Sequence, residues 1–509
     1  MTDESTRQPP ARAAWLVVAV VFVLHLLPRP GYGFHRDTFL YIAMGDHLDL
    51  FRMQFPPMIA LLARVADWIP GSLLFGTRLL PALGLVGIMA LGIAITARMG
   101  CGPGARLLVA VGIAASPMQE AVGALFQPVV FELLWWGLAA YAFVVLLDGG
   151  GPRWWLLLGL AMGLGGLTKF SAAVFGMAMA VAVLASPLRA ELRTRWPWLA
   201  VLIGALVALP SVTGQMTHGW PFFAQLEVLR EQQLERVSPV TLVAEQPLLA
   251  GGGTLLLLPG LAALFFLPAL RRFRPVGIYA CTACLILLIT GGKAYYLGAV
   301  HLPLFAAGAV AMAVWLRERA WLRSGVVVAM TIVGLVLLPV VLPLWPPPTL
   351  SAYLGRLGLA RATATNYGTQ LPLPQDLADM TGWREQVEEV ARVYHALPAA
   401  EQPRTVIVGG NYGRAGALVV YGPEFGLPYP VSRNGDFWAW GPGQTDPEVV
   451  IIVGGTVEEL SQIFGHVTEA GRSRNRWATE EEQDVPIHVC RHPRVPLGRL
   501  WQELGPEWG

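Results

Sequence analysis

Long apolar segments, about eleven in number, constrain the fold of this chain more than any other feature. A helix needs about 20 predominantly apolar residues to cross the hydrocarbon core of a membrane. The candidate spans are residues 13–29, 79–98, 105–122, 128–147, 153–168, 170–187, 196–213, 252–270, 275–291, 296–316 and 323–346. The sequence therefore predicts a polytopic α-helical membrane protein, with residues 1–346 as its membrane domain.

The composition supports this class and excludes others. Charged residues make up 14% of the 509 residues, whereas a typical soluble protein has about 25%. A net charge of +2, with no basic run that carries interleaved aromatic residues, argues against a nucleic-acid partner. Four cysteines are too few for a disulfide framework. Two arginines precede the first apolar run without a small-residue cleavage site, which predicts a retained first span.

Arginines predict the orientation of the spans. Connections on the cytoplasmic side of a membrane carry an excess of basic residues, and alternate connections here are rich in arginine. The arginines are Arg98, Arg106, Arg153, Arg189, Arg193, Arg195, Arg271, Arg272, Arg274, Arg317, Arg319 and Arg323. We expect a multi-pass protein of the inner (plasma) membrane, with a cytoplasmic N-terminus and the chain from Trp345 onward outside the cytoplasm.

A proline run at residues 342–350 cannot continue a helix, and we expect a second domain, residues 347–509, to follow it. Apolar strands that alternate with helices are typical of a small α/β domain. We expect helices at 383–397 and 458–464, and strands at 405–409, 417–421, 448–453 and 485–490. The glycines of 406–418 lack the complete dinucleotide-binding pattern, so a glycine-rich turn is favoured over a nucleotide site. The aromatic run 437–440 either stacks on a sugar or packs the domain, and the sequence leaves both open.

The first outer loop, residues 30–78, contains the most informative polar stretch, 33–57. His35, Arg36 and Asp37 open it, and a short helical pattern begins at Asp37. A carboxylate at the membrane boundary, partly shielded by protein, can act as a base on a substrate that arrives from lipid. The alternative is a hydrated loop in which Asp37 only caps the helix. A second amphipathic piece spans 55–68, and the outer loop 214–251 carries His218 and helical spacing over 222–235.

Two lysines stand at the outer ends of predicted spans. Lys293, with Tyr295 and Tyr296, follows two glycines, and an ammonium with two hydroxyls there can clamp a lipid-linked phosphate. The alternative is a lysine that only extends toward the lipid headgroups. Lys169, in the turn 168–171, has the same two interpretations. Glu132 begins an apolar span, either as a carboxylate favoured by the helix dipole or as a second acid near Asp37.

No metal site has a recognised spacing. Four residues of the first outer loop carry metal-ligating side chains: His35, Asp46, His47 and Asp49. Their spacing matches no known metal motif, so we predict no metal site and no certain cofactor, although a divalent cation stays possible.

Seven segments form an ordered set along the chain. They are HRDTFLYIAMGDHL (35–48), FPPMIALLAR (55–64), LFQPVVFELLWW (125–136), GLTKFSA (166–172), HGWP (218–221), GGKAYYL (291–297) and NYGRAGALVVYGPEFGLP (411–428). Each segment has low specificity alone, but their order along the chain is fairly specific. Together they resemble the GT-C class of bacterial polytopic glycosyltransferases, in particular glycosyltransferase family 39, the protein O-mannosyltransferases and the lipid A aminoarabinose transferases.

The resemblance implies transfer of a sugar from a polyprenyl-phosphate donor to a lipid, glycan or protein acceptor at the outer face. It implies that Asp37 is the catalytic base and that Lys293 contacts the donor phosphate. Two departures bear on the donor or acceptor: Thr38 stands where relatives commonly have glutamate, and Phe55 stands where many have histidine. We also expect His35, Arg36, Glu132 and His218 to contact substrate.

Two rival functions explain the spans equally well. A transporter or flippase of lipid-linked sugars is the main alternative, but transporters usually carry ionisable residues near the bilayer midplane, and this chain has almost none there. The third interpretation is that the protein is a receptor or an assembly scaffold in which the C-terminal domain, residues 347–509, is the active part.

Overall fold

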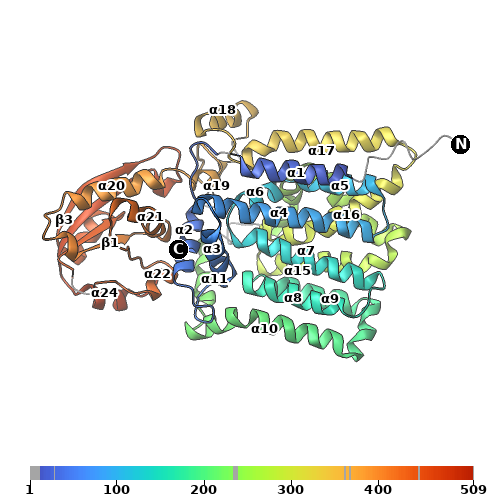
Figure 1. Ribbon diagram of the computed structural model, residues 1–509, viewed down its shortest axis with the longest axis horizontal. Helices are drawn as coiled ribbons and strands as arrows, with labels where there is room; N and C mark the ends of the chain where they lie inside the picture. Colours follow the sequence, from blue (N-terminus) through green and yellow to red (C-terminus); the bar gives the residue numbers. More distant parts are fainter. Residues whose placement is uncertain are drawn as a thin grey trace.

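The computed structural model describes residues 12–27, 29–232, 239–359, 363–365, 368–444 and 447–507. A bundle of helices makes up the larger part, and a smaller domain that contains a β-sheet packs against one end of it (Figure 1). Helices from the first outer loop lie between the two parts.

Seven helical stretches among the described residues are long and apolar enough to cross a membrane. Four of them are single helices: α4 (Leu73–Arg98), α7 (Pro128–Leu147), α10 (Arg195–Thr217) and α17 (Ala320–Val341). The other three consist of consecutive helical elements. Pro239–Phe266 consists of α12 (Pro239–Ala244), α13 (Gln246–Ala250), η4 (Gly251–Gly253) and α14 (Thr254–Phe266); Pro268–Thr290 consists of η5 (Pro268–Phe273) and α15 (Arg274–Thr290); and Ala294–Trp315 consists of η6 (Ala294–Leu297) and α16 (Gly298–Trp315).

Two bent pairs and two shorter helices account for the other predicted segments. The pair α5 (Pro103–Ala114) and α6 (Pro117–Ala124) bends by 65°, and the pair α9 (Ala172–Leu184) and η2 (Pro187–Arg193) bends by 96°. The shorter apolar helices are α1 (Ala13–Leu26) and α8 (Trp154–Thr168). The polytopic helical class is confirmed, while by length and composition seven of the eleven predicted segments qualify as spans, or nine with the bent pairs.

All three of the helical patterns predicted in the outer loops form helices. These are α2 (Arg36–Asp46), α3 (Met58–Trp68) and α11 (Pro221–Gln232); residues 233–235 of the last pattern lie outside the described residues. All three helices are found at the end of the bundle that faces the C-terminal domain (Figure 1). The two outer loops and the C-terminal domain are therefore at the same end of the molecule.

A four-stranded sheet of order β1-β2-β4-β3 organises the C-terminal domain. β1 (Thr405–Gly409) and β2 (Val449–Val453) are parallel, whereas β4 (Asp484–Pro493) runs antiparallel to β2 and to β3 (Phe464–Arg474). The remaining elements after the bundle are α18 (Pro347–Leu357), α19 (Gln375–Ala378), α20 (Trp383–His395), η8 (Gln402–Arg404), α21 (Tyr412–Tyr421), η9 (Gly422–Phe425), α22 (Asp436–Ala439), α23 (Val457–Ile463), η10 (Glu480–Glu482) and α24 (Leu497–Leu504).

Most of the expected elements of this domain are confirmed, but one predicted strand is wrong and one strand was missed. Residues 417–421 belong to the helix α21, because Asn411 caps it by accepting a hydrogen bond from the Arg414 amide and the apolar run continues at helical spacing. Strand β3 was missed since it lies at the sheet edge and its residues are mostly polar and exposed, so it lacks the apolar pattern of a buried strand.

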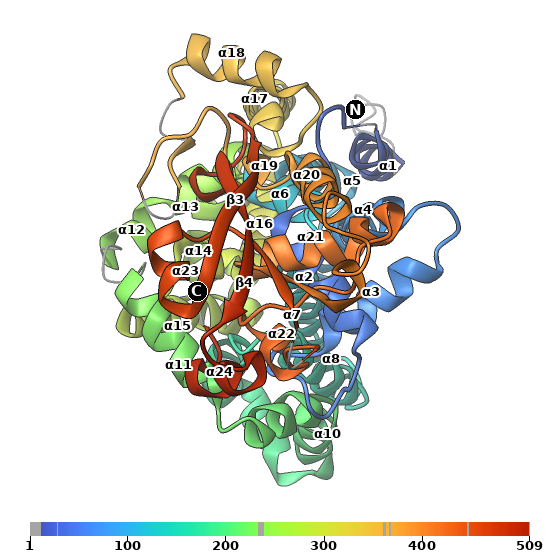
Figure 2. The same ribbon diagram turned by 90° about the vertical axis from the view of Figure 1, so that its left-hand side faces the viewer.

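Helices α2 and α21 lie against each other where the bundle meets the C-terminal domain (Figure 2). Phe34 and Phe39 share an apolar cluster with Trp383 and with the sheet residues Ile407 and Ile451. The first outer loop thus contributes to the interior of the C-terminal domain, which fixes α2 between the two parts of the protein.

Candidate active site

Asp37 lies in the first turn of α2 and receives hydrogen bonds from two distant parts of the chain. His35 caps the helix, with its Nδ1 accepting from the Asp37 amide at 3.1 Å. The Gln127 side-chain amide donates to Asp37 Oδ2 at 2.8 Å, and the Tyr412 hydroxyl donates to Oδ1 at 2.8 Å. The Asp37 side chain keeps 29% of its surface exposed. Its carboxylate is therefore fixed in place and still accessible.

His35 and Arg36 point toward the C-terminal domain. His35 is buried, and its Nε2 lies 3.9 Å from a carboxylate oxygen of Asp376 and of Asp379. The two terminal nitrogens of Arg36 donate to the two carboxylate oxygens of Glu481 at 3.2 and 3.3 Å. Both residues were expected to contact substrate, and the structure places both against protein carboxylates.

Lys293 stands in the turn between α15 and η6. Gly291 ends α15 in the left-handed conformation (φ 75°), which glycine adopts without strain, and Lys293 follows with extended backbone just before η6. Burial lowers the pKa of Lys293, the charge of Lys169 lowers it further, and the carboxylate of Asp37 opposes this. Charges shift one another's pKa only at short range, so Lys293 lies within electrostatic range of both Lys169 and Asp37. We call these three groups the Asp37 cluster.

Lys169 ends α8 with extended backbone and completes the cluster. Its Nζ lies 3.4 Å from Glu132 Oε2 on α7, and 5.1 and 4.5 Å from the ring centres of Tyr295 and Tyr296. The Ser171 hydroxyl donates to the other oxygen of Glu132. Glu132 is thus the ion-pair partner of Lys169, and both tyrosines predicted beside Lys293 lie under the ammonium of Lys169.

These are the only two lysines in the 509 residues. They lie 124 positions apart in the sequence, and every other basic side chain, histidine aside, is an arginine. An ammonium is a compact charge that binds phosphate as a point charge, whereas arginine offers a planar fork. The structure therefore gathers all of the ammonium side chains of the protein near Asp37.

Other sequence-predicted residues contact different partners. His218 caps the end of α10 and its Nδ1 bonds with the Gly214 carbonyl at 3.0 Å. Asp46 pairs with Arg64 at 3.2 Å, and the ring of His47 stacks on Trp440 at 4.0 Å. Within the described residues, no three histidine, cysteine, aspartate or glutamate side chains gather as metal ligands.

Gln127 and Tyr412 were not among the predicted site residues. Both lie in segments that carry the family resemblance, and Gln127 directly precedes the proline that opens α7. Tyr412 is 375 positions from Asp37 in the sequence. No local pattern reveals such a contact, because only the docking of the C-terminal domain creates it.

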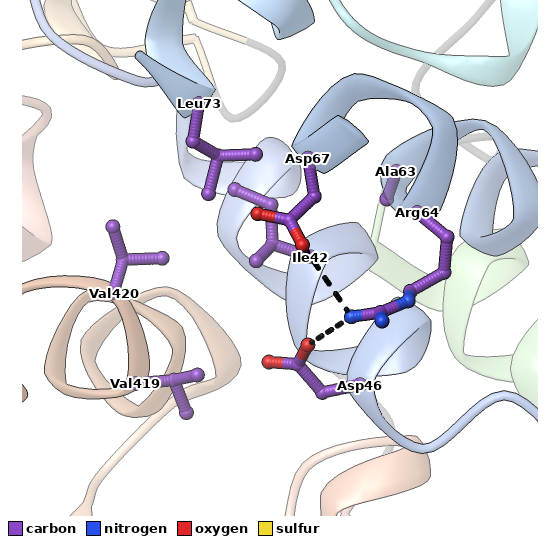
Figure 3. A pocket seen from close by; sticks show the side chains of 8 residues that line it. All are labelled: Ile42, Asp46, Ala63, Arg64, Asp67, Leu73, Val419 and Val420. Carbon is purple, nitrogen blue, oxygen red and sulfur yellow. Dashed lines mark hydrogen bonds and ion pairs between the residues drawn. The ribbon is translucent and has the colours of Figure 1, made fainter. Parts of the chain in front are cut away.

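A pocket of about 150 Å³ opens on a different face of α2 (Figure 3). Arg64 stands between Asp46 and Asp67 on one side, and Val419 and Val420 of α21 form the other. Asp46 follows Asp37 by nine residues, which is about half a turn around the helix axis at roughly 100° per residue. This pocket is thus separate from the Asp37 cluster.

Comparisons with known proteins identify a family model and solved structures that this chain resembles. Residues 54–213 match the sequence model of the family described as dolichyl-phosphate-mannose-protein mannosyltransferase. ArnT from Cupriavidus metallidurans bound to undecaprenyl phosphate is similar with a TM-score of 0.58 and 15% identity, over 94% of this chain and 98% of ArnT. The same protein in the apo state gives 0.58 and 16%, over 93% and 97%. No curated protein matches the chain by sequence.

The mycobacterial arabinofuranosyltransferase AftD gives a TM-score of 0.49 and 14% identity, over 96% of this chain and 40% of AftD. The resemblance to GT-C glycosyltransferases predicted from the sequence is confirmed, and the chain has the ArnT fold, a multi-pass helical bundle with a small C-terminal sheet domain.

Proposed function

We propose that this chain, which has the fold of ArnT, transfers a sugar from a polyprenyl-phosphate donor to a hydroxyl acceptor at the outer face of a membrane. The observation that carries the proposal is the gathering of Asp37, Lys293 and Lys169. Asp37 begins α2, and this helix lies at the end of the bundle that faces the C-terminal domain (Figure 1). One of the ArnT structures contains undecaprenyl phosphate, the kind of lipid phosphate that two ammonium groups fit.

The two lysines act on the leaving group. A sugar linked to polyprenyl phosphate is a phosphodiester with one negative charge. When the sugar is transferred, the polyprenyl phosphate that leaves is a phosphate monoester with up to two negative charges. Lys293 and Lys169 therefore attract the phosphate more strongly as the bond from the anomeric carbon to oxygen breaks, which is the kind of interaction that lowers a barrier. Glu132 and the rings of Tyr295 and Tyr296 hold Lys169 in place.

Asp37 acts on the incoming group. The acceptor hydroxyl loses its proton as its oxygen attacks the anomeric carbon, and the Asp37 carboxylate accepts that proton. A carboxylate offers about four acceptor positions. The hydrogen bonds from Gln127 and Tyr412 use two of them, which leaves room for the acceptor hydroxyl. A single displacement inverts the anomeric centre, so the product has the opposite anomeric configuration to the donor.

The test is release of polyprenyl phosphate by the purified full-length protein, given an undecaprenyl-phosphate sugar and an acceptor mixture from outer-envelope lipids. We expect release by the natural protein and a loss of roughly 100- to 10,000-fold in Asp37→Asn, because removal of a general base costs about two to four orders of magnitude. The matched control is Asp49→Asn, an exposed carboxylate of the same loop, which should keep full activity.

The outcomes separate the alternatives. A transporter or flippase would move the intact donor across a vesicle membrane without releasing polyprenyl phosphate. A scaffold would do neither. Equal release by the natural protein and by Asp37→Asn would refute the role of this carboxylate. The proposed acceptor is a lipid, a glycan or a protein, and the proposed location is the inner membrane, with the N-terminus in the cytoplasm.

A further inference from the structure

We infer that the C-terminal domain is a working part of the transfer site, with Tyr412 as the positioning residue that holds Asp37 in its reactive orientation. This inference rests on the proposed role of Asp37 as the base. It goes further because it assigns a function to the domain outside the membrane bundle and to a residue far from the first outer loop.

Three consecutive residues of that loop each contact the C-terminal domain. His35 lies beside the carboxylates of Asp376 and Asp379. Arg36 donates two hydrogen bonds to the carboxylate of Glu481. Asp37 accepts a hydrogen bond from the hydroxyl of Tyr412. The Arg36 guanidinium also lies 4.8 Å from the centre of the Tyr412 ring. The start of α2 is therefore one of the places at which the two parts of the protein join, and the Asp37 carboxylate is inside that junction.

Glycines bring α21 close enough to make these contacts. A methyl carbon added at Gly416 would lie 2.5 Å from Cβ of Phe39, and one added at Gly413 would lie 2.7 Å from Cγ of Arg36 and 2.9 Å from the ring of Trp383. Real side chains do not approach so closely. The glycine-rich segment 409–416 thus permits close packing against α2, which explains its composition without a nucleotide.

The position of Tyr412 suits a hydrogen-bond donor. It is the first residue of α21, where Asn411 caps the helix and the Asn434 side chain accepts from the Tyr412 amide. Burial, and after it the Asp37 carboxylate, raise the pKa of Tyr412 well above its ordinary value. The hydroxyl stays protonated over the working range of pH and donates to Asp37 Oδ1, while Gln127 fixes Oδ2.

Loss of the hydroxyl has a specific consequence for the reaction. Without it, the carboxylate can rotate and its ionised form loses one donor. A hydrogen bond to a charged group contributes enough to change a rate by roughly 10- to 100-fold. The donor phosphate contacts the lysines and not Tyr412, so the KM for the donor should stay the same.

The experiment compares Tyr412→Phe with Tyr421→Phe in the full-length protein. Tyr421 is on the same helix and its ring packs on Phe34 and Phe39, so its loss controls for removal of a phenol from this interface. We expect Tyr412→Phe to lower kcat by roughly 10- to 100-fold at constant donor KM. We also expect the acid limb of its kcat profile to move to higher pH, because the ionised carboxylate loses a donor.

A second variant covers the case in which Tyr412→Phe is poorly folded. Gly416→Val adds bulk against Phe39 and should push α21 away, so it should lower kcat and move the acid limb in the same direction as Tyr412→Phe. Natural kcat and natural pH profile in folded Tyr412→Phe, with Asp37→Asn inactive, would overturn this inference and leave the transferase proposal standing. If the natural protein releases no polyprenyl phosphate, the proposed function itself fails.

Discussion

Replacement of Lys293 by methionine tests the phosphate site most sharply, because the charges of the site can be counted. Asp37 and Glu132 contribute two negative charges, and Lys293 and Lys169 two positive ones. The site is therefore neutral when empty, and Lys293→Met leaves it with one net negative charge. A phosphate that enters the variant meets one ammonium and two carboxylates.

The size of the effect follows from the contact that is lost. Two unit charges about 4 Å apart interact by about 4 kcal/mol at an effective dielectric constant of roughly 20. Desolvation of both groups offsets part of this, and a charge-assisted hydrogen bond contributes about 1.5–3 kcal/mol net. We therefore expect undecaprenyl phosphate to bind Lys293→Met roughly 10- to 100-fold more weakly. Binding of undecaprenol, which carries no charge, should not change.

The scarcity of lysine provides the assay. An acylating reagent for amines has only Lys169, Lys293 and the chain's α-amino group as targets, and mass spectrometry quantifies each position. The ammonium of Lys169 is buried and paired with Glu132, whereas the Lys293 side chain is only partly buried, so Lys293 is the lysine expected to react. Undecaprenyl phosphate should protect Lys293 in the natural protein, while undecaprenol at the same concentration should not. Equilibrium binding of radiolabelled undecaprenyl phosphate to Lys293→Met then gives the weakened affinity, and Arg317→Met, which removes a cation from an exposed connection between helices, is the matched control. Equal affinity in Lys293→Met, or no protection of Lys293 in the natural protein, would refute the phosphate site.

Two further predictions concern pH. Burial lowers the pKa of Lys293 below its ordinary 10.5, so the affinity for undecaprenyl phosphate should fall early in the alkaline range. Lys293→Arg stays charged and should abolish this fall. If the affinity of Lys293→Arg falls with the same midpoint pH, the titration belongs to another group. Burial raises the pKa of Asp436 from 3.8 to about 7. Between these two values the folded state holds a proton that the unfolded state releases. The free energy of unfolding should therefore fall as the pH rises from about 4 to 7, by about 4 kcal/mol in total at roughly 1.4 kcal/mol per pH unit. Asp436→Asn should lose this decline in a thermal-unfolding series between pH 5 and 8, and an identical slope in both proteins would contradict it.

The helical part of the fold could be predicted because its signal is local. Each apolar segment specifies its own helix in a membrane, so all eleven predicted segments coincide with helical elements. The number of spans could not be predicted as well, since hydropathy does not report a bend such as the one between α5 and α6. In the C-terminal domain, the short apolar run at 417–421 suits a strand or a buried helix equally, and the cap at Asn411 decides for the helix.

The candidate site also combines residues that the local sequence reveals with contacts that only the packing of the chain creates. Asp37, Lys293 and Lys169 were predicted because charge at a span boundary stands out against an apolar background. Their closeness, and the pairing of Lys169 with Glu132, depend on how the helices pack. The contact of Arg36 with Glu481 was not predicted, because the sequence does not show where the C-terminal domain docks. Tyr412 was missed for the same reason.

The central claim is spatial: one lipid phosphate binds between both lysines, beside Asp37. An experimental density map of the full-length natural protein with undecaprenyl phosphate tests it most directly. The account predicts density for the phosphate in contact with the ammonium groups of Lys293 and Lys169, with its free side open toward the Asp37 carboxylate. Phosphate density among the arginine-bearing connections, or at any place that leaves both lysines without contact, would contradict it.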